Sequence, residues 1–464
     1  MILKDGKIYV DGLLHKGSLL INKGIIEAIK YNPSIEDEKR FIEKNQDGKE
    51  INCMNKIILP GIIDIHSHLR DMGQCHKETF NTGTKAAAFS GITTVFNMPN
   101  TKPPAIDAKT VKKWMEKAQN NIFVDVGFIA GVPKEIDIKE IRKILELGVI
   151  GFKIYPLSPL NSIDWCEPLN VQKLLHISSK FLIPVFIHPD RPLPEEEREL
   201  ILKEHAIENY SFLKLHDKLH PTNMEADYVN FIIENYYKLI ADNNLNPEEY
   251  PIVHFCHISC SESYNLIKQT LSKYNKLKIS FEITPHHLLL SNEINIKNES
   301  FGKVLPPLRE EIHSKLLFDE LKQGKINLVG TDHAPHTIDE KLKGFFDSPS
   351  GFPGFETLPL LLLDKVCRYE LSLRNFVYAT SESPARIFKL DKKGFIKEGY
   401  DADLLIVEKF PEYSINPELF KTKAKYSPYE NFKTSLSVWK VFLKGFEINT
   451  EDSEPKGKII NKEI

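Results

Sequence analysis

Ile57-Ile58-Leu59-Pro60-Gly61-Ile62-Ile63-Asp64-Ile65-His66-Ser67-His68-Leu69-Arg70 runs from an apolar segment into polar residues. The apolar part predicts a buried strand, because strands covered on both faces read as continuous hydrophobic runs. Side chains alternate between the two faces of a strand, so His66 and His68 point the same way. Two imidazoles side by side at a strand end suit one divalent metal ion, although this spacing also arises by chance.

Further apolar runs follow, separated by segments that can form helices. With residues 57–66 the runs make eight, and the others cover residues 92–98, 122–130, 149–155, 182–188, 251–257, 277–283 and 326–332. Helix-compatible segments lie between them, as at residues 107–119 and 138–147. Eight repeated β-α units predict the α/β class, as a (β/α)8 TIM barrel.

The two ends of the chain have a different texture. Short β-like pieces occur near the start, at residues 7–10 and 18–24, and return near the end, at residues 401–407 and 438–443. Alternating short strands with turns between them are typical of a small β domain. We therefore expect both ends to combine into one β-sandwich beside the barrel.

These patterns divide the chain into three segments. Residues 1–56 and 391–464 are expected to form the small β domain, and residues 57–390 the barrel. The polar residues 31–50 predict a surface loop. The charged run at residues 195–199 predicts the start of an exposed helix, since such a run is usually a solvated face.

Composition excludes several classes of partner. The chain has 464 residues, of which 41% are hydrophobic and 27% charged, as in ordinary globular proteins. A net charge of -3 gives no reason to expect nucleic acid or an anionic membrane as the main partner. There is no apolar run of about 18 residues and no signal-peptide pattern, so we expect a cytoplasmic protein. The six scattered cysteines are expected to be reduced thiols.

Most predicted strands end in a residue able to do chemistry. The active sites of barrel enzymes are built at the carboxyl ends of the strands and in the loops that follow them. These ends carry His66, Asn97, Lys153, His188, His257 and Asp332. The coincidence is stronger evidence for one active site at the barrel mouth than any single motif.

Histidine and aspartate are ordinary ligands of zinc-like ions, and two ions can share a bridging water and lower its pKa. Lys153 does not fit this set as an ammonium, which repels cations, but a carbamate made with carbon dioxide would be a bridging anion. The alternative for Lys153 is an ion pair or a contact with a substrate anion. Asp332 could accept a proton from the attacking water and pass it to a leaving nitrogen, or be an ordinary turn residue.

Polar residues on neighbouring loops could hold a substrate. Arg70, Asn100 and His336 are suited to grip a carboxylate or an amide, and the fork of arginine matches a carboxylate in a bidentate way. A surface or structural role fits each of the three equally well. Other histidines near the site are interpreted as supporting or packing residues: His254, His286, His287 and His333.

Several motifs, in this order along the chain, resemble the amidohydrolase superfamily and within it the dihydroorotases. They are Pro60-Gly61-Ile62-Ile63-Asp64-Ile65-His66-Ser67-His68-Leu69-Arg70-Asp71, Met98-Pro99-Asn100-Thr101, Gly151-Phe152-Lys153-Ile154-Tyr155 and Thr331-Asp332-His333-Ala334-Pro335-His336. The likeness runs from about residue 57 to residue 388, and residues 399–404 resemble the tail of that family.

The resemblance implies a binuclear zinc site with two ions in each subunit. His66 and His68 would bind one ion and His188 and His257 the other. Carbamylated Lys153 and a hydroxide would bridge the ions, and Asp332 would complete the first. The substrate-binding residues would be Arg70, Asn100 and His336, which would hold the carboxylate of dihydroorotate or carbamoyl-aspartate.

The implied activity is the reversible hydrolysis of (S)-dihydroorotate to N-carbamoyl-L-aspartate in pyrimidine biosynthesis. The resemblance also implies a homodimer and allows association with aspartate transcarbamoylase. An allantoinase or dihydropyrimidinase is the nearest alternative, but a neutral ring does not call for a clamp made by Arg70 and Asn100. A non-catalytic scaffold is the other alternative, and retention of all six candidate ligands counts against it.

Overall fold

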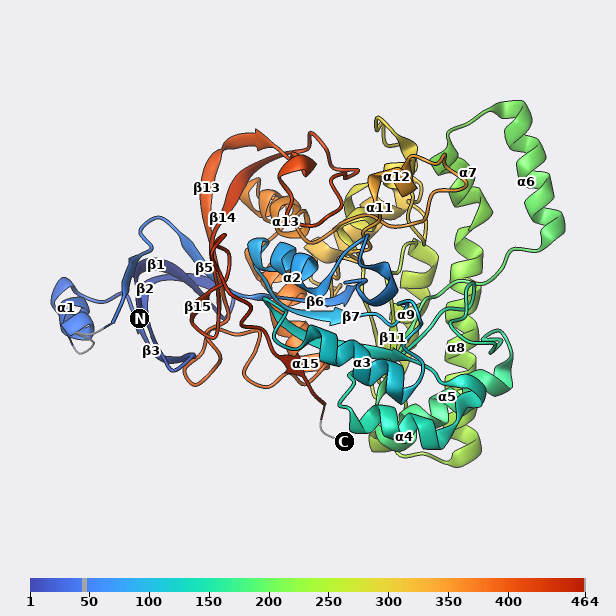
Figure 1. The fold of residues 1–464 in the computed structure, drawn as a ribbon, viewed down its shortest axis with the longest axis horizontal. Helices are drawn as coiled ribbons and strands as arrows, with labels where there is room; N and C mark the ends of the chain where they lie inside the picture. Colours follow the sequence, from blue (N-terminus) through green and yellow to red (C-terminus); the bar gives the residue numbers. More distant parts are fainter. Residues whose placement is uncertain (44–47, 463–464) are drawn as a thin grey trace.

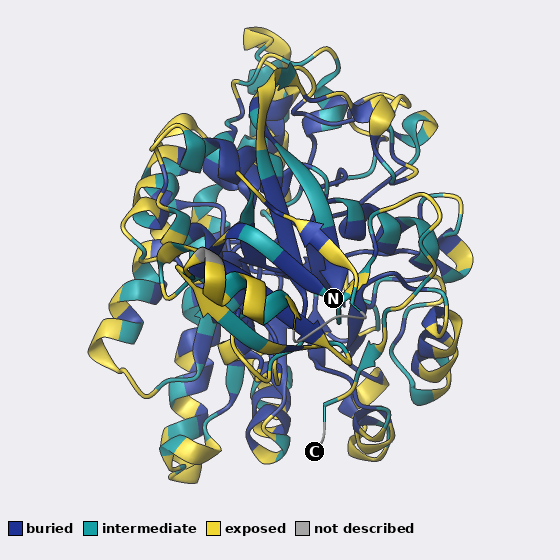
Figure 2. Ribbon diagram, turned by 90° about the vertical axis from the view of Figure 1, so that its left-hand side faces the viewer, coloured by how far each residue is buried: buried dark blue, intermediate teal, exposed yellow. Residues whose placement is uncertain are grey.

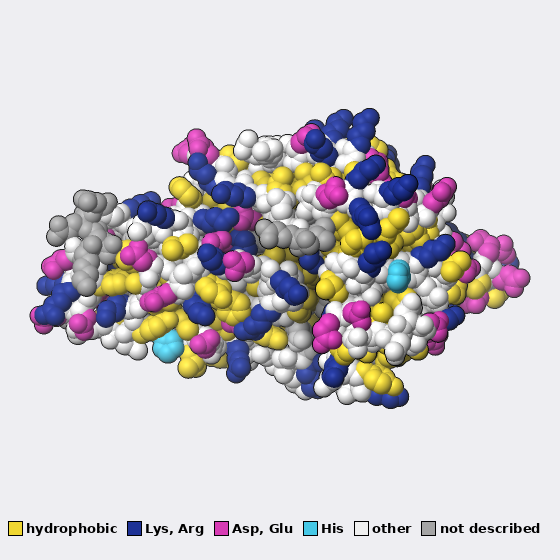
Figure 3. Space-filling view, turned by 90° about the horizontal axis from the view of Figure 1, so that it is seen from below, with side chains coloured by type: hydrophobic (Ala, Val, Ile, Leu, Met, Phe, Trp, Pro, Cys, Tyr) yellow, Lys and Arg dark blue, Asp and Glu magenta, His cyan; other side chains and the backbone are white. Residues whose placement is uncertain are grey.

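Two sheets organise the chain in this computed structural model, which describes residues 1–43 and 48–462. A parallel sheet surrounded by helices lies on the right in Figure 1, and a mixed sheet made from both ends of the chain lies on the left. In the described residues no helix is long and apolar enough to cross a membrane. On the face drawn in Figure 3, lysines and arginines are interspersed with acidic side chains rather than gathered in one basic patch.

The strands of the parallel sheet are neighbours in the order in which they occur along the chain. They are β6 (Ile62–Ser67), β7 (Ile92–Asn97), β8 (Asp125–Gly131), β9 (Gly151–Ile154), β10 (Pro184–Ile187), β11 (Ile252–Phe255) and β12 (Ile279–Phe281). Nearly all their residues are buried, as expected for parallel strands covered on both faces. All carboxyl ends therefore open at one mouth, which confirms the predicted barrel.

The eighth predicted strand, residues 326–332, is not a regular strand, so this part of the prediction is wrong. The ring is instead closed by isolated parallel bridges, Ile283 with Val329 and Ser67 with His333. The backbone N–H of Thr331 donates to the Asp64 carboxylate, with 2.8 Å between nitrogen and oxygen, and not to a strand carbonyl. A side chain thus replaces the backbone partner that a continuous ladder would use.

Helices cover the outside of the barrel, with their buried faces turned toward the strands (Figure 2). They are α2 (Phe80–Phe89), α3 (Ala108–Ala118), α4 (Ile138–Glu146), α5 (Pro168–Phe181), α8 (Thr222–Asn243), α9 (Ser261–Lys273), α11 (Glu311–Lys322), α13 (Leu358–Cys367), α14 (Leu373–Val377) and α15 (Ser383–Ile387). Further helices lie in the loops: α6 (Glu195–Glu208), α7 (Phe212–Leu219), α10 (Pro285–Leu289) and α12 (Ile338–Lys341). As predicted, α6 is exposed, and it stands away from the body in Figure 1.

The mixed sheet has the strand order β15-β14-β13-β5-β1-β2-β3, with β4 beside β1. Its strands are β1 (Ile2–Val10), β2 (Leu13–Asn22), β3 (Ile25–Tyr31), β4 (Glu50–Asn52), β5 (Ile57–Pro60), β13 (Leu404–Ser414), β14 (Lys433–Leu443) and β15 (Phe446–Glu447). A bridge joins Ile25, at the start of edge strand β3, to Asp401, just before β13, and the strands share a separate apolar core. The chain ends therefore meet in one β unit.

The run predicted as one strand at residues 57–66 is two strands that belong to different sheets. β5 pairs with β1 and β13, whereas β6 begins the barrel. The break falls at Gly61, where an added Cβ would lie 2.2 Å from Thr93 Oγ1, so the chain passes too close to β7 for a side chain. We propose Gly61 as the boundary between the two units.

Two other segments differ from the prediction. Residues 35–43, expected as part of a surface loop, form helix α1 (Ile35–Glu43), and the Ser34 hydroxyl accepts a hydrogen bond from the Asp37 N–H at 3.1 Å, as an N-cap does. Residues 44–47 of that predicted loop lie outside the described residues. The last strand, β16 (Ile459–Ile460), pairs with β8 of the barrel and not with the mixed sheet.

A cluster of buried ion pairs joins the barrel to the unit formed by the mixed sheet. Lys393 Nζ lies 2.8 Å from Asp125 Oδ2 on β8 and 2.6 Å from Asp403 Oδ2 beside β13. Lys444 Nζ lies 2.9 Å from the same Asp125 oxygen. Burial alone would raise the pKa of Asp125, but the two lysines hold it below the ordinary value. The cluster therefore stabilises the fold while Asp125 is ionised.

We expect Lys393→Met to lower the free energy of unfolding by about 3–5 kcal/mol at neutral pH, because it leaves Asp125 and Asp403 buried without their shared cation. Because the pKa of Asp125 is lowered in the folded state, its contribution is present at neutral pH and is lost as the pH falls below about 4. Urea denaturation at neutral pH and at a pH below about 4 would measure the free energy of unfolding. Lys456→Met, which removes an exposed pair with Glu454, should change little. Equal effects of the two substitutions would contradict the prediction.

Candidate functional site

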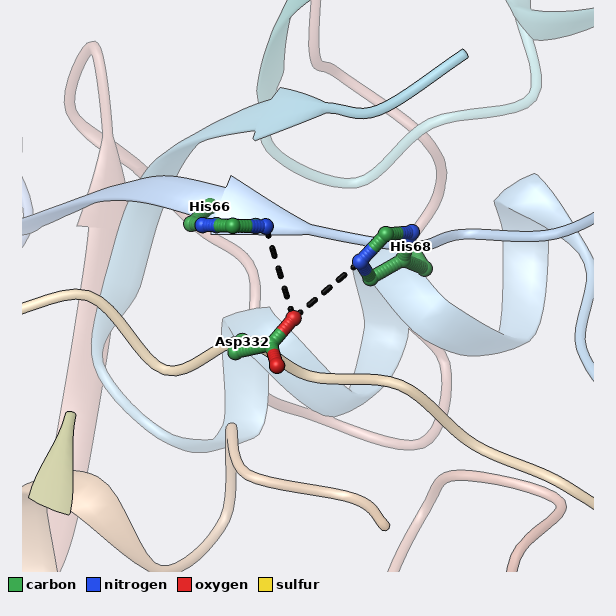
Figure 4. A group of neighbouring side chains, drawn as sticks. All are labelled: His66, His68 and Asp332. Atoms are coloured by element: carbon green, nitrogen blue, oxygen red, sulfur yellow. Dashed lines mark hydrogen bonds and ion pairs between the residues drawn. The ribbon is translucent and has the colours of Figure 1, made fainter. Parts of the chain in front are cut away.

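Three of the predicted ligands come together at the barrel mouth (Figure 4). His66 is the last residue but one of β6, His68 follows that strand, and Asp332 comes from the segment that closes the ring. Asp332 Oδ1 lies 3.4 Å from His66 Nε2 and 3.1 Å from His68 Nε2. All three side chains are buried, and they offer ligand atoms within 4.8 Å of one another. This donor set fits one divalent metal ion.

The backbone of Asp332 is held in an unusual conformation. Its φ is 47°, in the left-handed region that few non-glycine residues adopt. Asp64 fixes the preceding residue by accepting hydrogen bonds from both the backbone N–H and the hydroxyl of Thr331. Burial raises the pKa of Asp64 to about 7. The hydrogen bonds between Asp64 and Thr331 therefore join the first strand to the closing segment and hold Asp332 in its strained conformation. In this conformation Asp332 faces the two histidines.

A second pair of histidines lies beside the first. His188 Nδ1 is 3.0 Å from His257 Nε2, and the His257 ring lies 5.0 Å from the His66 ring, centre to centre. Among the described residues, His188 Nε2 and His257 Nδ1 have no hydrogen-bond partner although both are buried. Buried polar atoms are rarely left unpaired, so these nitrogens are suited to bind a ligand or a metal ion.

Lys153 points into the same interior. It belongs to β9, its side chain is 1% exposed, and its Nζ has no hydrogen-bond partner among the described residues. The centre of the Tyr155 ring lies 5.2 Å from Nζ. A buried, unpaired ammonium is costly, and the ion-pair interpretation finds no carboxylate within ion-pair distance in the described parts of the chain. A modified or ligand-bound Lys153 would remove that cost.

The protonation states of His68, His188 and Asp332 suit metal binding. Burial, with the charge of Lys153, lowers the pKa of His188 to about 3, and burial also lowers the pKa of His68 to about 4. Burial would raise the pKa of Asp332, but the charge of His66 and the contact with His68 hold it below its usual range. Neutral imidazoles and an ionised carboxylate are the forms that ligate metals.

Glu282 is a functional candidate that the sequence analysis missed. It follows β12, is fully buried, and its carboxylate contacts His66 Nδ1. The same carboxylate lies 3.1 Å from His254 Nε2 and accepts the His257 backbone N–H at 3.3 Å. Its charge raises the pKa of His66 to about 10 against the effect of burial. A carboxylate behind a ligating histidine fixes its ring, and an acid inside the apolar run 277–283 was the available signal.

Arg70 and His336 meet on the loops above this cluster. Arg70 Nη2 lies 3.1 Å from His336 Nε2, and Arg70 Nε donates to the Pro335 carbonyl at 3.2 Å. Both side chains are buried, and Arg70 has a φ of 56°. Asp71 holds this turn by accepting the Phe80 backbone N–H at 3.0 Å. The turn thereby directs a buried guanidinium toward the mouth.

The structure places Asn100 differently from Arg70 and His336. Its Oδ1 lies 2.6 Å from His68 Nδ1, so it accepts a hydrogen bond from that ring and leaves Nε2 free to face Asp332. No hydrogen bond joins Asn100 to Arg70 in the described residues. This geometry indicates that Asn100 orients the His68 ring.

The other histidines have local partners. His254 Nδ1 lies 2.9 Å from the Ser280 hydroxyl, and His287 Nδ1 lies 2.8 Å from the Thr284 hydroxyl. His333 stacks on Phe355 with ring centres 3.8 Å apart. These contacts are those of supporting and packing residues. His286 packs edge-on against a phenylalanine, Phe352, with its Nε2 unpartnered among the described residues.

Solved structures with the same fold include two hydantoinases. The L-hydantoinase (dihydropyrimidinase) from Arthrobacter aurescens matches with a TM-score of 0.85 at 20% identity, covering 99% of each chain. The D-hydantoinase (dihydropyrimidinase) from a Thermus species matches with a TM-score of 0.83 at 23% identity, covering 100% of this chain and 99% of that one. At such low identity these matches establish the fold alone.

Sequence comparisons identify the family as well as the fold. Residues 195–448 match the model of the amidohydrolase family, and residues 55–149 match a dihydro-orotase-like model. A dihydroorotase of Pyrococcus abyssi is 35% identical over 99% of this chain and 98% of its own length. A dihydroorotase of Methanosphaera stadtmanae is 34% identical over 91% and 92%. The chain belongs to the amidohydrolase family, and both of these relatives are dihydroorotases.

Proposed function

We propose that the chain is a dihydroorotase, which reversibly hydrolyses the cyclic amide of (S)-dihydroorotate to N-carbamoyl-L-aspartate in pyrimidine biosynthesis. The observation that carries the choice of substrate is the buried pair of Arg70 and His336 above the histidine and aspartate cluster. A buried guanidinium needs an anionic partner, and dihydroorotate brings a carboxylate next to its amide ring.

The proposed metal ligands follow from the donor set. His66, His68 and Asp332 would hold one zinc ion, His188 and His257 the other, and carbamylated Lys153 would bridge the two. When bound, the ions would supply a Lewis acid for the amide carbonyl and lower the pKa of the attacking water. The unpartnered nitrogens of Lys153, His188 and His257 support this arrangement, since each would gain a partner.

The residues of the chain would then bind, orient and move a proton. Arg70 and His336 would hold the substrate carboxylate, which fixes the ring over the cluster. Asn100 would keep His68 in its orientation. Asp332 would accept a proton from the attacking water on a carboxylate oxygen and deliver it to the ring nitrogen that leaves.

Two other functions fit the site less well. An allantoinase or dihydropyrimidinase would act on a neutral ring, which would leave the buried charge of Arg70 without a partner. A non-catalytic scaffold would not need six buried candidate ligands around one mouth. A homodimer, association with aspartate transcarbamoylase and a cytoplasmic location stay predictions.

Purified, zinc-loaded protein should turn over dihydroorotate but neither allantoin nor dihydrouracil. Arg70→Gln should raise KM for dihydroorotate by about 10- to 100-fold, because hydrogen bonds to a charged group contribute roughly 1.5–3 kcal/mol. Steady-state kinetics on the three substrates would measure both. Absence of turnover with dihydroorotate would overturn the proposed function, and faster turnover of allantoin or dihydrouracil would favour the neutral-ring alternative.

A further inference from the structure

Lys77 lies beside His336 without a function so far. It belongs to the loop between Arg70 and α2, and its side chain is 12% exposed. Lys77 Nζ lies 2.9 Å from His336 Nδ1 and 3.1 Å from Glu340 Oε1. These contacts bring an ammonium group to the far side of the imidazole that faces Arg70.

The contacts of His336 select one of its two neutral forms. A lysine ammonium can only donate, so the contact with Lys77 requires Nδ1 to accept and places the ring proton on Nε2. Nε2 lies 3.0 Å from the Ser350 carbonyl, which can only accept, and this agrees with a proton on Nε2. The other form would satisfy Arg70 alone, since Glu340 is 3.8 Å from Nδ1 and too distant to accept its proton.

This proton position prepares an anion site. Two donors, His336 Nε2–H and Arg70 Nη2–H, lie 3.1 Å apart and cannot hydrogen-bond to each other. A carboxylate oxygen between them would accept from Arg70 and, in place of the Ser350 carbonyl, from His336 Nε2–H. With the proton on Nδ1 instead, Nε2 would present a lone pair to the carboxylate and repel it.

Glu340 keeps Lys77 in place. Besides its ion pair with Lys77, Glu340 accepts the Thr337 backbone N–H at 3.0 Å in the capping box that starts α12. Glu340 is therefore fixed by its helix, and Lys77 is fixed by Glu340. Polar contacts therefore run in sequence from Glu340 through Lys77 and His336 to Arg70.

We propose that Lys77 is a positioning residue that fixes the proton of His336 on Nε2, so that His336 and Arg70 together select substrates bearing a carboxylate next to the cyclic amide. The inference rests on the proposed function for the identity of the substrate, but its structural part does not. Lys77 would act on substrate binding through His336 and would not touch the reacting atoms.

The proton position can be read directly by NMR. In protein carrying 15N-labelled histidine, the His336 signal, identified by its absence in His336→Gln, should show an unprotonated Nδ1 and a protonated Nε2. Lys77→Met should shift that signal toward a mixture of the two forms. Lys85→Met removes a comparable pair, Lys85 with Glu451 at 2.9 Å on α2, and should leave the signal unchanged.

Kinetics would test the consequence for binding. Lys77→Met should raise KM for dihydroorotate by about tenfold with little change in kcat, because a charge-assisted contact is lost from the binding step only. Lys77→Arg, which keeps a donor cation, should restore most of the affinity, and Lys85→Met should match the unaltered protein.

A protonated Nδ1 in the unaltered protein would overturn the proposal, and this result does not depend on whether Lys77→Met folds. A His336 signal that ignores Lys77→Met, or a KM that does not change, would also overturn it. If the protein turned over no dihydroorotate, the proposed function would fail, while the NMR measurement would still decide the proton position.

Discussion

Lys153→Ala is expected to lower turnover of dihydroorotate by about a thousandfold or more and to reduce the zinc content of the purified protein. The Lys153 side chain is buried with its Nζ unpartnered among the described residues, and its charge acts on His66, His188 and His257. Losing a bridging anion would weaken the binding of both ions, and metal-supplied stabilisation of a transition state is worth several kcal/mol. Elemental analysis and steady-state kinetics would measure the two effects.

Rescue separates the carbamate from other functions of the lysine. Alanine leaves a cavity where a short carboxylic acid can supply the missing anion, so acetate or propionate should restore part of the activity of Lys153→Ala. Lys153→Arg keeps a cation and fills the space, so it should be inactive and should not respond. Intact mass measured without acid should exceed the sequence mass by one carbon dioxide. Full activity of Lys153→Ala without rescue would show that the bridge assignment is wrong.

Asp332→Asn is expected to lower kcat by about 10²- to 10⁴-fold, the range that a positioned proton acceptor contributes. Asparagine keeps the shape of the side chain but cannot accept and return a proton. The pKa of Asp332 is held below its usual range, so its carboxylate is in the accepting form at neutral pH. Kinetics should be measured together with zinc content, because the same oxygen atoms are candidate ligands.

If Asp332→Asn kept its full zinc content and still had a lowered kcat, the loss of activity would come from proton transfer and not from loss of metal. Asp339→Asn changes an exposed aspartate on α12 and should leave kcat and zinc content unchanged. If Asp332→Asn kept most of its kcat, the assignment of Asp332 as the proton carrier would be wrong.

Much of the fold could be predicted from runs of apolar residues. Continuous runs such as residues 92–98 and 182–188 are typical of parallel strands covered on both faces, and they became β7 and β10. The boundary at Gly61 could not be found in this way, since an apolar run looks the same whether one strand or two pass through it. What divides the run is the close approach of Thr93, a residue of the next strand.

The candidate site was predicted in part for a related reason. Strand ends in a barrel converge, so His66, His68 and Asp332 could be expected near one another before their distances were known. Glu282 escaped notice because one acid in an apolar run has no spacing pattern. Asn100 was predicted to contact the substrate. Its contact with His68 could not be predicted, because it depends on how the loop after β7 folds back.

The sequence by itself determined the strand-and-helix order and the kinds of side chain available at the strand ends. Only the tertiary structure decided which of these side chains meet. The contact between Glu282 and His66 joins residues 216 positions apart, and that between Lys77 and His336 joins residues 259 apart. Local patterns carry the period of a strand or a helix, whereas such contacts exist because closing the ring brings the first and last strands side by side.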